Sequence, residues 1–158
     1  MIIDCYSTDK FALDYIAKTM DDEVVSVQDI LDNKQKEIFS EKPYVFVMYY
    51  SNIFSISLIA KFFKIKFSGS KILYCVYTAP EYRTVFSETA KIITQCKGFI
   101  LFGSCSVGMK GDSIEKYAEN LNALACEMKN CSPLKNVGNL SFPLRIKSKQ
   151  DSNIQQVG

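Results

Sequence analysis

The stretch that most constrains the fold is YVFVMYY, residues 44–50, which is apolar or aromatic at every position. A strand exposed on one face alternates apolar and polar residues, whereas a strand buried on both faces of a parallel sheet does not. Residues 72–77, ILYCVY, repeat the unbroken pattern. Both stretches therefore predict strands that are covered on each face, and we place residues 44–50 in the central strand.

The segments on either side alternate between strand and helix patterns. Residues 2–6 are a short apolar run, and apolar side chains at helical spacing follow from Phe11 to Met20. The same criteria predict strands at 24–27 and 98–102, helices at 56–64, 85–93 and 114–128, a helical turn around Ile30 and Leu31 in the polar connection 28–42, and a turn at 68–70. Asp112 or Ser113 is expected to cap the last helix. This alternation predicts an α/β fold with a doubly wound, five-stranded parallel sheet.

The length of 158 residues suits one domain. We place that domain at residues 1–131. Residues 132–158 form a C-terminal tail that is partly docked or disordered, since Pro133, Gly138 and a polar end are typical of a loosely held segment. Residues 141–144, SFPL, are the part expected to dock on the domain.

Charge balance and the lengths of the apolar runs argue against some partners and compartments. Nineteen Lys and Arg face seventeen Asp and Glu, so a net charge of +2 gives no support to a nucleic-acid partner. No stretch approaches the ~20 apolar residues of a membrane span, and the N-terminus lacks the pattern of a signal peptide. We therefore expect a cytoplasmic protein with no membrane partner and leave its oligomeric state open.

The six cysteines do not form a metal or redox motif. No two stand in C-x-x-C, and the chain contains no histidine to complete a mixed zinc site. Cys5, Cys75 and Cys105 lie in predicted strands, where a reduced cysteine behaves as a small apolar residue. The missing histidine also removes Ser-His and Cys-His catalysis, so we expect no metal and do not favour a hydrolase.

Ligands of doubly wound sheets bind beyond the carboxyl ends of the strands, where the strand order reverses. The loops that matter are therefore residues 6–11, 50–54 and 78–83. Three other segments, YIAK at 15–18, EKPYVFV at 41–47 and FGSCSVGM at 102–109, make the chain resemble the flavodoxin half of ferredoxin-flavodoxin fusion proteins of anaerobes. The resemblance runs from about residue 2 to residue 128. It implies a three-layer α/β/α domain with strand order 2-1-3-4-5 that binds flavin mononucleotide (FMN) and transfers electrons.

The first loop is where the resemblance implies that the FMN phosphate binds. The cofactor-binding candidates there are Ser7, Thr8, Asp9, Lys10 and Phe11, and the glycines that the family uses for close backbone approach are missing. Asp9 has a second interpretation. It can cap the helix and satisfy its free N–H groups, which would repel an incoming phosphate.

The other two loops are implied to contact the flavin ring. Ser51, Asn52 and Ile53 are the candidates in the second loop, where Ile53 replaces the usual stacking aromatic, and Thr78, Ala79 and Tyr82 are the candidates in the third. The cysteine runs that hold clusters in the fusion proteins are absent, so no iron-sulfur cluster is expected.

We predict the first of the following two functions and keep the second as the alternative. One is an FMN-binding electron carrier or small flavoprotein, which would need an external redox partner protein. The other is a degenerate flavodoxin-like module that does not bind flavin and serves as a binding or regulatory unit, which Asp9, Phe11 and Ile53 favour. An enzyme that uses Glu81 or Asp112 has no supporting arrangement of residues.

Overall fold

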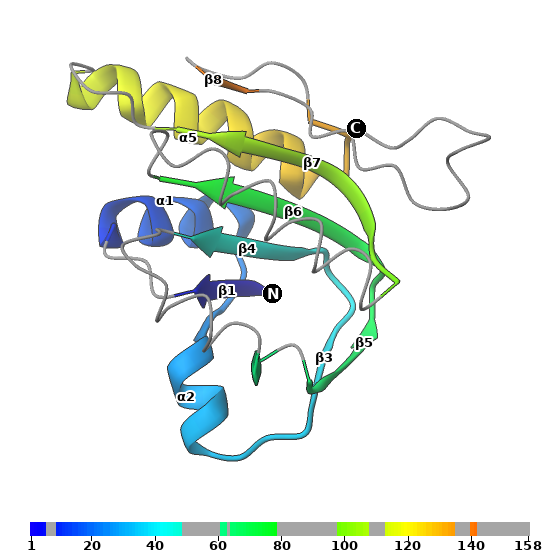
Figure 1. The fold of residues 1–158 in the computed structure, drawn as a ribbon. Helices are drawn as coiled ribbons and strands as arrows, with labels where there is room; N and C mark the ends of the chain where they lie inside the picture. The colour runs from blue at the N-terminus through cyan, green and yellow to red at the C-terminus, as the bar shows by residue number, and fades with distance from the viewer. Residues whose placement is uncertain are drawn as a thin grey trace.

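The computed structural model describes residues 1–5, 9–48, 61–62, 64–78, 98–107, 113–134 and 140–141. They form an α/β structure built around one twisted sheet (Figure 1). Within these residues, no helix is long and apolar enough to cross a membrane.

The main sheet contains five parallel strands and one short antiparallel strand. They are β1 (Ile2–Cys5), β2 (Val24–Ser26), β4 (Tyr44–Met48), β6 (Ile72–Tyr77), β7 (Ile100–Ser106) and β8 (Leu140–Ser141). Their order is β2-β1-β4-β6-β7-β8, and only β8 runs antiparallel to its neighbour. The five parallel strands confirm the predicted sheet and its order, with β4 and its fully buried side chains at the centre. The strand predicted at 98–102 instead begins at Ile100 and continues to Ser106, because β7 stays paired with β6 as far as Tyr77.

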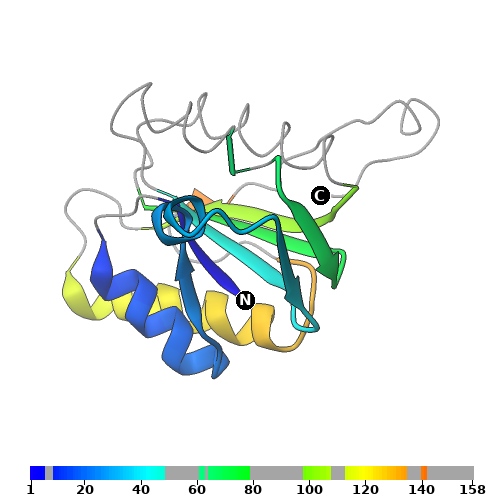
Figure 2. The same cartoon turned by 90° about the horizontal axis from the view of Figure 1, so that it is seen from below.

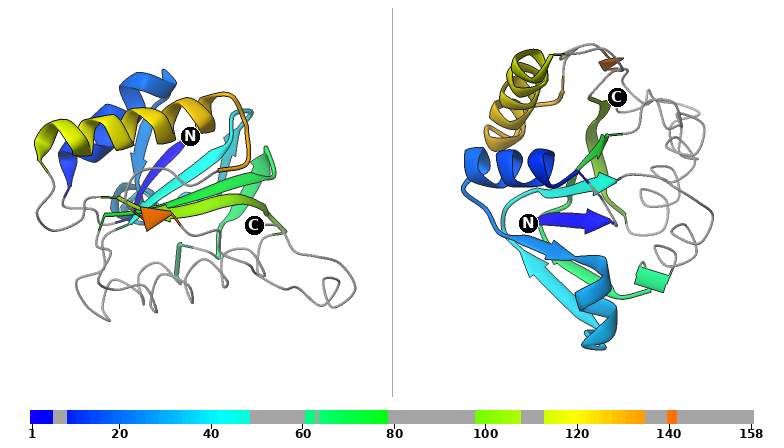
Figure 3. Two further views of the ribbon diagram at one scale, coloured as in Figure 1. Left: turned by 90° about the horizontal axis from the view of Figure 1, so that it is seen from above. Right: turned by 90° about the vertical axis from the view of Figure 1, so that its left-hand side faces the viewer.

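Two long helices cover one face of the sheet. They are α1 (Lys10–Met20) and α5 (Ile114–Lys129), which lie side by side in Figures 2 and 3. Leu13 and Ile16 of α1 and Leu121 of α5 pack with Val45 of β4 in one buried cluster. Both predicted helices are confirmed, and the oxygen of Ser113 accepts a hydrogen bond from the Lys116 N–H as the predicted cap.

A second, aromatic cluster lies on the other face. It joins the inward side chains of the sheet to Ile30 of α2 (Val27–Asp32), the helical turn expected there. The rings of Tyr44, Phe62, Phe67 and Phe99 meet at centroid distances of 5.3–5.6 Å in edge-on geometry. The bulk of the two predicted helices at 56–64 and 85–93 lies outside the described residues.

Two further strands correct the sequence analysis. The connection 28–42 contains β3 (Glu37–Ser40), and the expected turn at 68–70 begins inside β5 (Lys66–Gly69). They pair in parallel as a separate two-stranded sheet. The offset between partners, Ser40 with Gly69, is the same as that between Tyr44 of β4 and Leu73 of β6. The small sheet is therefore a continuation of the β4–β6 ladder across a bend, which a search for single apolar runs does not detect.

Gly69 makes this pairing possible. Its φ is +91°, and a Cβ placed there would lie 2.1 Å from the carbonyl oxygen of Ser40. Ser70 N–H donates to that same oxygen at 2.7 Å, so the backbones approach closely. Any side chain at position 69 would separate them.

The amino end of the sheet holds the chain's N-terminal ammonium. It donates to Asp22 Oδ2 at 2.6 Å, to the carbonyl oxygen of Pro43 at 2.9 Å and to Ser40 Oγ at 3.2 Å. The Met1 and Asp22 side chains are each only 10% exposed. Three acceptors therefore satisfy the three N–H groups of a largely buried cation.

Part of the segment after residue 131 contacts the sheet. Tyr74 Oη donates to the carbonyl oxygen of Ser132 at 2.7 Å, and Leu134 N–H donates to that of Phe102 at 2.9 Å. Leu134 packs directly over Gly103, where a Cβ would come within 2.5 Å of it. Ser141, in the stretch expected to dock, belongs to β8, and residues 142–144 lie outside the described residues.

Candidate functional site

The candidate site is the edge of the sheet at which β1 and β4 end. The chain leaves β1 toward β2 on one side, and β4 lies on the other side of β1. This reversal of strand order is the position at which open α/β sheets bind ligands. Asp9, Lys10 and Phe11 from the first loop and Thr78 from the third are the candidate residues that the structure describes there.

Asp9 caps helix α1. Its Oδ1 accepts the N–H of Ala12 at 3.0 Å, so one free donor of the first turn is satisfied. Its Oδ2 accepts a hydrogen bond from the hydroxyl of Tyr117 in α5. Both carboxylate oxygens are thus engaged, one by the helix start and one by a neighbouring helix.

The pKa of Tyr117 is raised by this environment. Burial, the hydrogen bond to Asp9 and the negative charge of that carboxylate together raise the pKa of Tyr117 far above its ordinary value. The phenol is therefore a permanent donor throughout the physiological range. The sequence analysis placed Tyr117 only within the helix predicted at 114–128. Its polar role follows from the sheet order, which brings the starts of α1 and α5 together.

Lys10 is paired with an acidic residue of the sheet. Its Nζ lies 3.0 Å from Asp4 Oδ2, and the Asp4 side chain is only 9% exposed. The Lys10 side chain itself is 68% exposed, so solvent screens the pair strongly. The sequence analysis did not select Asp4, although it is the only charged residue in the apolar run 1–5.

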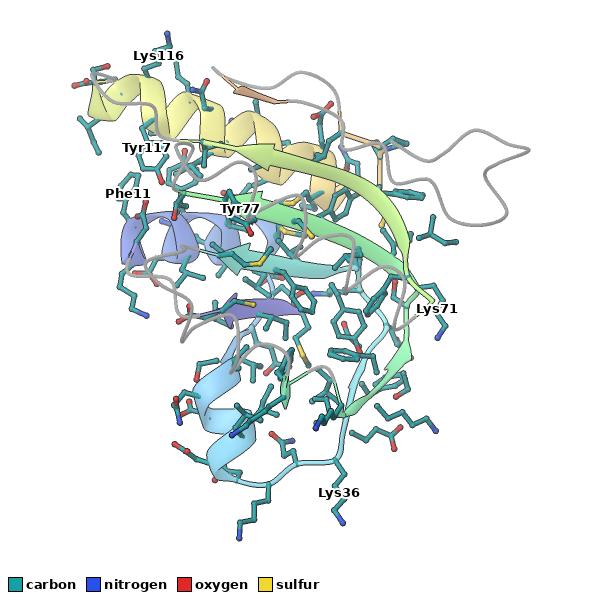
Figure 4. The ribbon with its side chains drawn as sticks, in the orientation of Figure 1. Phe11, Lys36, Lys71, Tyr77, Lys116 and Tyr117 are labelled. Carbon is teal, nitrogen blue, oxygen red and sulfur yellow. The ribbon has the colours of Figure 1, made fainter. Side chains whose placement is uncertain are left out.

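Phe11 lies on the surface between the two helices. Its ring centroid is 5.9 Å from that of Tyr15 and 5.7 Å from that of Tyr117, and the residue is 42% exposed. Figure 4 shows Phe11 and Tyr117 next to each other at the ends of α1 and α5. Position 11, a candidate for phosphate contact in the sequence analysis, therefore carries an aromatic contact between helices.

Thr78 faces the neighbouring strand. Its N–H donates to the carbonyl oxygen of Met48 at 3.1 Å, and its hydroxyl donates to the same oxygen at 3.4 Å. The side chain thus secures the end of β6 against the end of β4. The remaining candidates lie outside the described residues: Ser7, Thr8, Ser51, Asn52, Ile53, Ala79 and Tyr82.

Cys5, at the end of β1, is buried, and so is Cys75 in β6. Desolvation first, then the charges of Asp4 and Cys75, raise the pKa of the Cys5 thiol well above its ordinary value. Cys5 is thus a poor thiolate nucleophile. Among the residues that the structure describes, no three His, Cys, Asp or Glu side chains come together as metal ligands.

Comparison of the chain with protein-family models, with curated proteins and with solved structures gave no match.

Proposed function

We propose that this chain is a flavodoxin-like module of three α/β/α layers that serves as a binding or regulatory unit and does not anchor FMN through a phosphate on its first loop. The observation that carries the proposal is the state of Asp9. Its two carboxylate oxygens accept from the α1 backbone and from Tyr117.

A bound phosphate requires free N–H donors at a helix start and no negative charge beside them. Asp9 supplies the anion from the chain itself, and such a cap contributes about 1 kcal/mol to stability. Two unit charges 4 Å apart near a protein surface repel by about 4 kcal/mol. A phosphate dianion at this position would have to displace the carboxylate or overcome that repulsion.

The neighbouring cation gives a phosphate little compensation. Lys10, the one basic residue among the first-loop candidates, is already paired with Asp4 at 3.0 Å. Its transfer to a phosphate would leave the largely buried Asp4 carboxylate without that ammonium. The side chains at this edge therefore pair with one another, Asp9 with Tyr117 and Asp4 with Lys10, and this arrangement disfavours a phosphate site.

The second candidate function is an FMN-binding electron carrier that works with an external redox partner protein. The strand order supports it, because the order reverses between β1 and β4. Flavodoxin, a known example of ligand binding at such a reversal, holds its FMN at the corresponding position. Under this function the flavin supplies the redox chemistry. Thr78 would lie beside the ring, and Asp9 would have to turn away from the helix start.

Purified full-length protein distinguishes the two functions. We expect a colourless protein, no flavin fluorescence after heat denaturation and no thermal shift with added FMN, since a ligand specific for the native state must stabilise it. Stoichiometric FMN in the purified protein would overturn the proposal and establish the electron carrier.

The Asp9→Asn variant tests the physical reason. Asparagine still caps a helix but carries no charge, so we expect inorganic phosphate and FMN to stabilise this variant more than the wild type. Asp14→Asn, an exposed change on the same helix, is the matched control. Equal responses of both variants to phosphate would contradict the role of Asp9 as an internal anion.

A further inference from the structure

Lysine is concentrated in one part of the chain. Residues 33–71 contain seven Lys and two Glu, with no Arg or Asp, although basic and acidic residues are nearly balanced overall. These residues include β3 and β5, which precede β4 and β6 and so lie at the opposite end of the main sheet from Asp9 (Figure 1). The segment that contains β3 and β5 is therefore rich in lysine, and the candidate site does not use these strands.

The small sheet of β3 and β5 exposes an aromatic ring at this end. Glu37 and Phe39 alternate with the buried Ile38 and Ser40, and Phe39 is 57% exposed. Glu37 pairs with Lys66 and Phe39 with Ser68, and paired residues on adjacent strands share a face. Phe39 and Lys66 therefore point outward together. The Phe39 ring also lies beside Gly69, with its Cε1 3.2 Å from an ideal Cβ at that position.

Two more lysines flank the small sheet. Lys36 directly precedes β3 and Lys71 closely follows β5, and Figure 4 shows both side chains pointing away from the protein. Within the described part of the chain, no carboxylate oxygen lies within 4.0 Å of the ammonium of Lys36, Lys66 or Lys71. We call Phe39 and these three lysines the β3–β5 surface.

We propose that the β3–β5 surface is a docking site for an acidic polypeptide segment of a partner protein. Carboxylates of the partner would face the three lysines, and an apolar side chain of the partner would cover Phe39. Aromatic side chains surrounded by polar groups supply much of the energy at protein interfaces, while complementary charge supplies specificity and fast association.

The side chains of the surface favour a polypeptide over a nucleic acid. Glu37 lies on the same face as Phe39 and is held there by Ser68, whose hydroxyl donates to Glu37 Oε2 at 2.9 Å. A fixed carboxylate at the centre of the surface repels a phosphate backbone, whereas a polypeptide can place a donor opposite it. The proposal is independent of what the edge at Asp9 binds.

Fluorescence anisotropy of the full-length protein tests the proposal. The probe is a short fluorescein-labelled peptide of Glu and Asp around one central Leu, titrated at low salt. Replacement of Lys36, Lys66 and Lys71 together by Gln should weaken binding by about tenfold. Phe39→Ala should weaken it by about fivefold.

The matched control replaces three exposed lysines of α1 and α5, which lie outside the β3–β5 surface, by Gln, at positions 18, 116 and 129. It should change the affinity by less than about twofold. Equal weakening by the control, or no binding of the peptide to the wild type, would overturn the proposal. So would a single-stranded oligothymidylate that binds the wild type more tightly than the peptide does.

A second measurement needs no variant. Amide chemical shifts of the wild type, recorded while the peptide is added, should change at residues 36–40 and 66–71. Changes confined to α1 and α5 would place the contact elsewhere and overturn the proposal.

Discussion

The hydrogen bond between Tyr117 and Asp9 predicts how strongly α1 and α5 are coupled. Tyr117→Phe removes the hydroxyl that donates to Asp9 and leaves the ring contact with Phe11 at 5.7 Å possible. The oxygen of Asp9 that accepts from Ala12 keeps its partner. The variant thus changes one interaction between two helices and preserves the cap.

The expected loss follows from the charge of the acceptor. A hydrogen bond to an ionised group contributes about 1.5–3 kcal/mol, more than a neutral one, and this hydrogen bond is partly buried. We expect Tyr117→Phe to lower the free energy of unfolding by about 2 kcal/mol. For a chain of this length, that corresponds to a fall in Tm of roughly 4–8 °C.

Urea unfolding followed by circular dichroism measures the change, and an unaltered m-value shows that the same surface is exposed in both proteins. Tyr15→Phe is the matched control. The Tyr15 ring also contacts Phe11, but its hydroxyl makes no hydrogen bond within the described residues. A double-mutant cycle with Asp9→Asn should show coupling of about 1 kcal/mol or more. A loss below about 0.5 kcal/mol, or an equal loss in Tyr15→Phe, would refute the reasoning.

Three further results are expected. Gly69→Ala should destabilise the protein by at least about 3 kcal/mol, because the backbone of Ser40 lies where the new Cβ would be. Gly98→Ala, at a φ of +67° but with no atom within 4 Å of the new Cβ, should cost only about 1 kcal/mol, and equal losses in thermal unfolding would argue against the clash at Gly69. Asp22→Asn should cost about 2 kcal/mol in guanidinium unfolding, since it leaves the Met1 ammonium with neutral acceptors, and an unchanged midpoint would contradict this. Burial and Asp9 raise the folded-state pKa of Tyr117 above the unfolded value of about 10, so the contribution of this phenol to folding stability is complete below pH 10 and is lost as pH rises further. The wild type should therefore lose more stability than Tyr117→Phe between pH 9 and 11, and parallel pH profiles of the two proteins would disprove this.

The two ends of the sheet differ in chemistry. At the carboxyl end, an internal anion and an internal acid-base pair satisfy the groups that a phosphate would need. At the amino end, lysines around Phe39 lack carboxylate partners within the described residues. Together these observations favour recognition of a partner protein over chemistry at a cofactor, and the FMN and peptide titrations test the two ends separately.

The sequence alone was sufficient for the main helices and strands along the chain, whereas the order of the strands in the sheet was implied only by the resemblance. Uninterrupted apolar runs such as 44–48 mark strands buried on both faces, and the apolar spacing of α1 and α5 marks helices that cover a sheet. Ser113 was one of the two residues predicted as the cap of α5, because a capping side chain acts within one turn of chain. These features are local, so a short window of residues contains the physical information that determines them.

Only the tertiary structure decided the contacts between distant segments. The pairing of β3 with β5 depends on Gly69 allowing a close approach to Ser40, and neither strand is long or apolar enough to be recognised in isolation. Asp9 has one local contact and one contact with a distant segment. Its capping of α1 was one of two readings of the sequence, but its bond to Tyr117 joins residues 108 positions apart. No local pattern encodes such a contact, because it exists only once the sheet order has brought the two helix starts together.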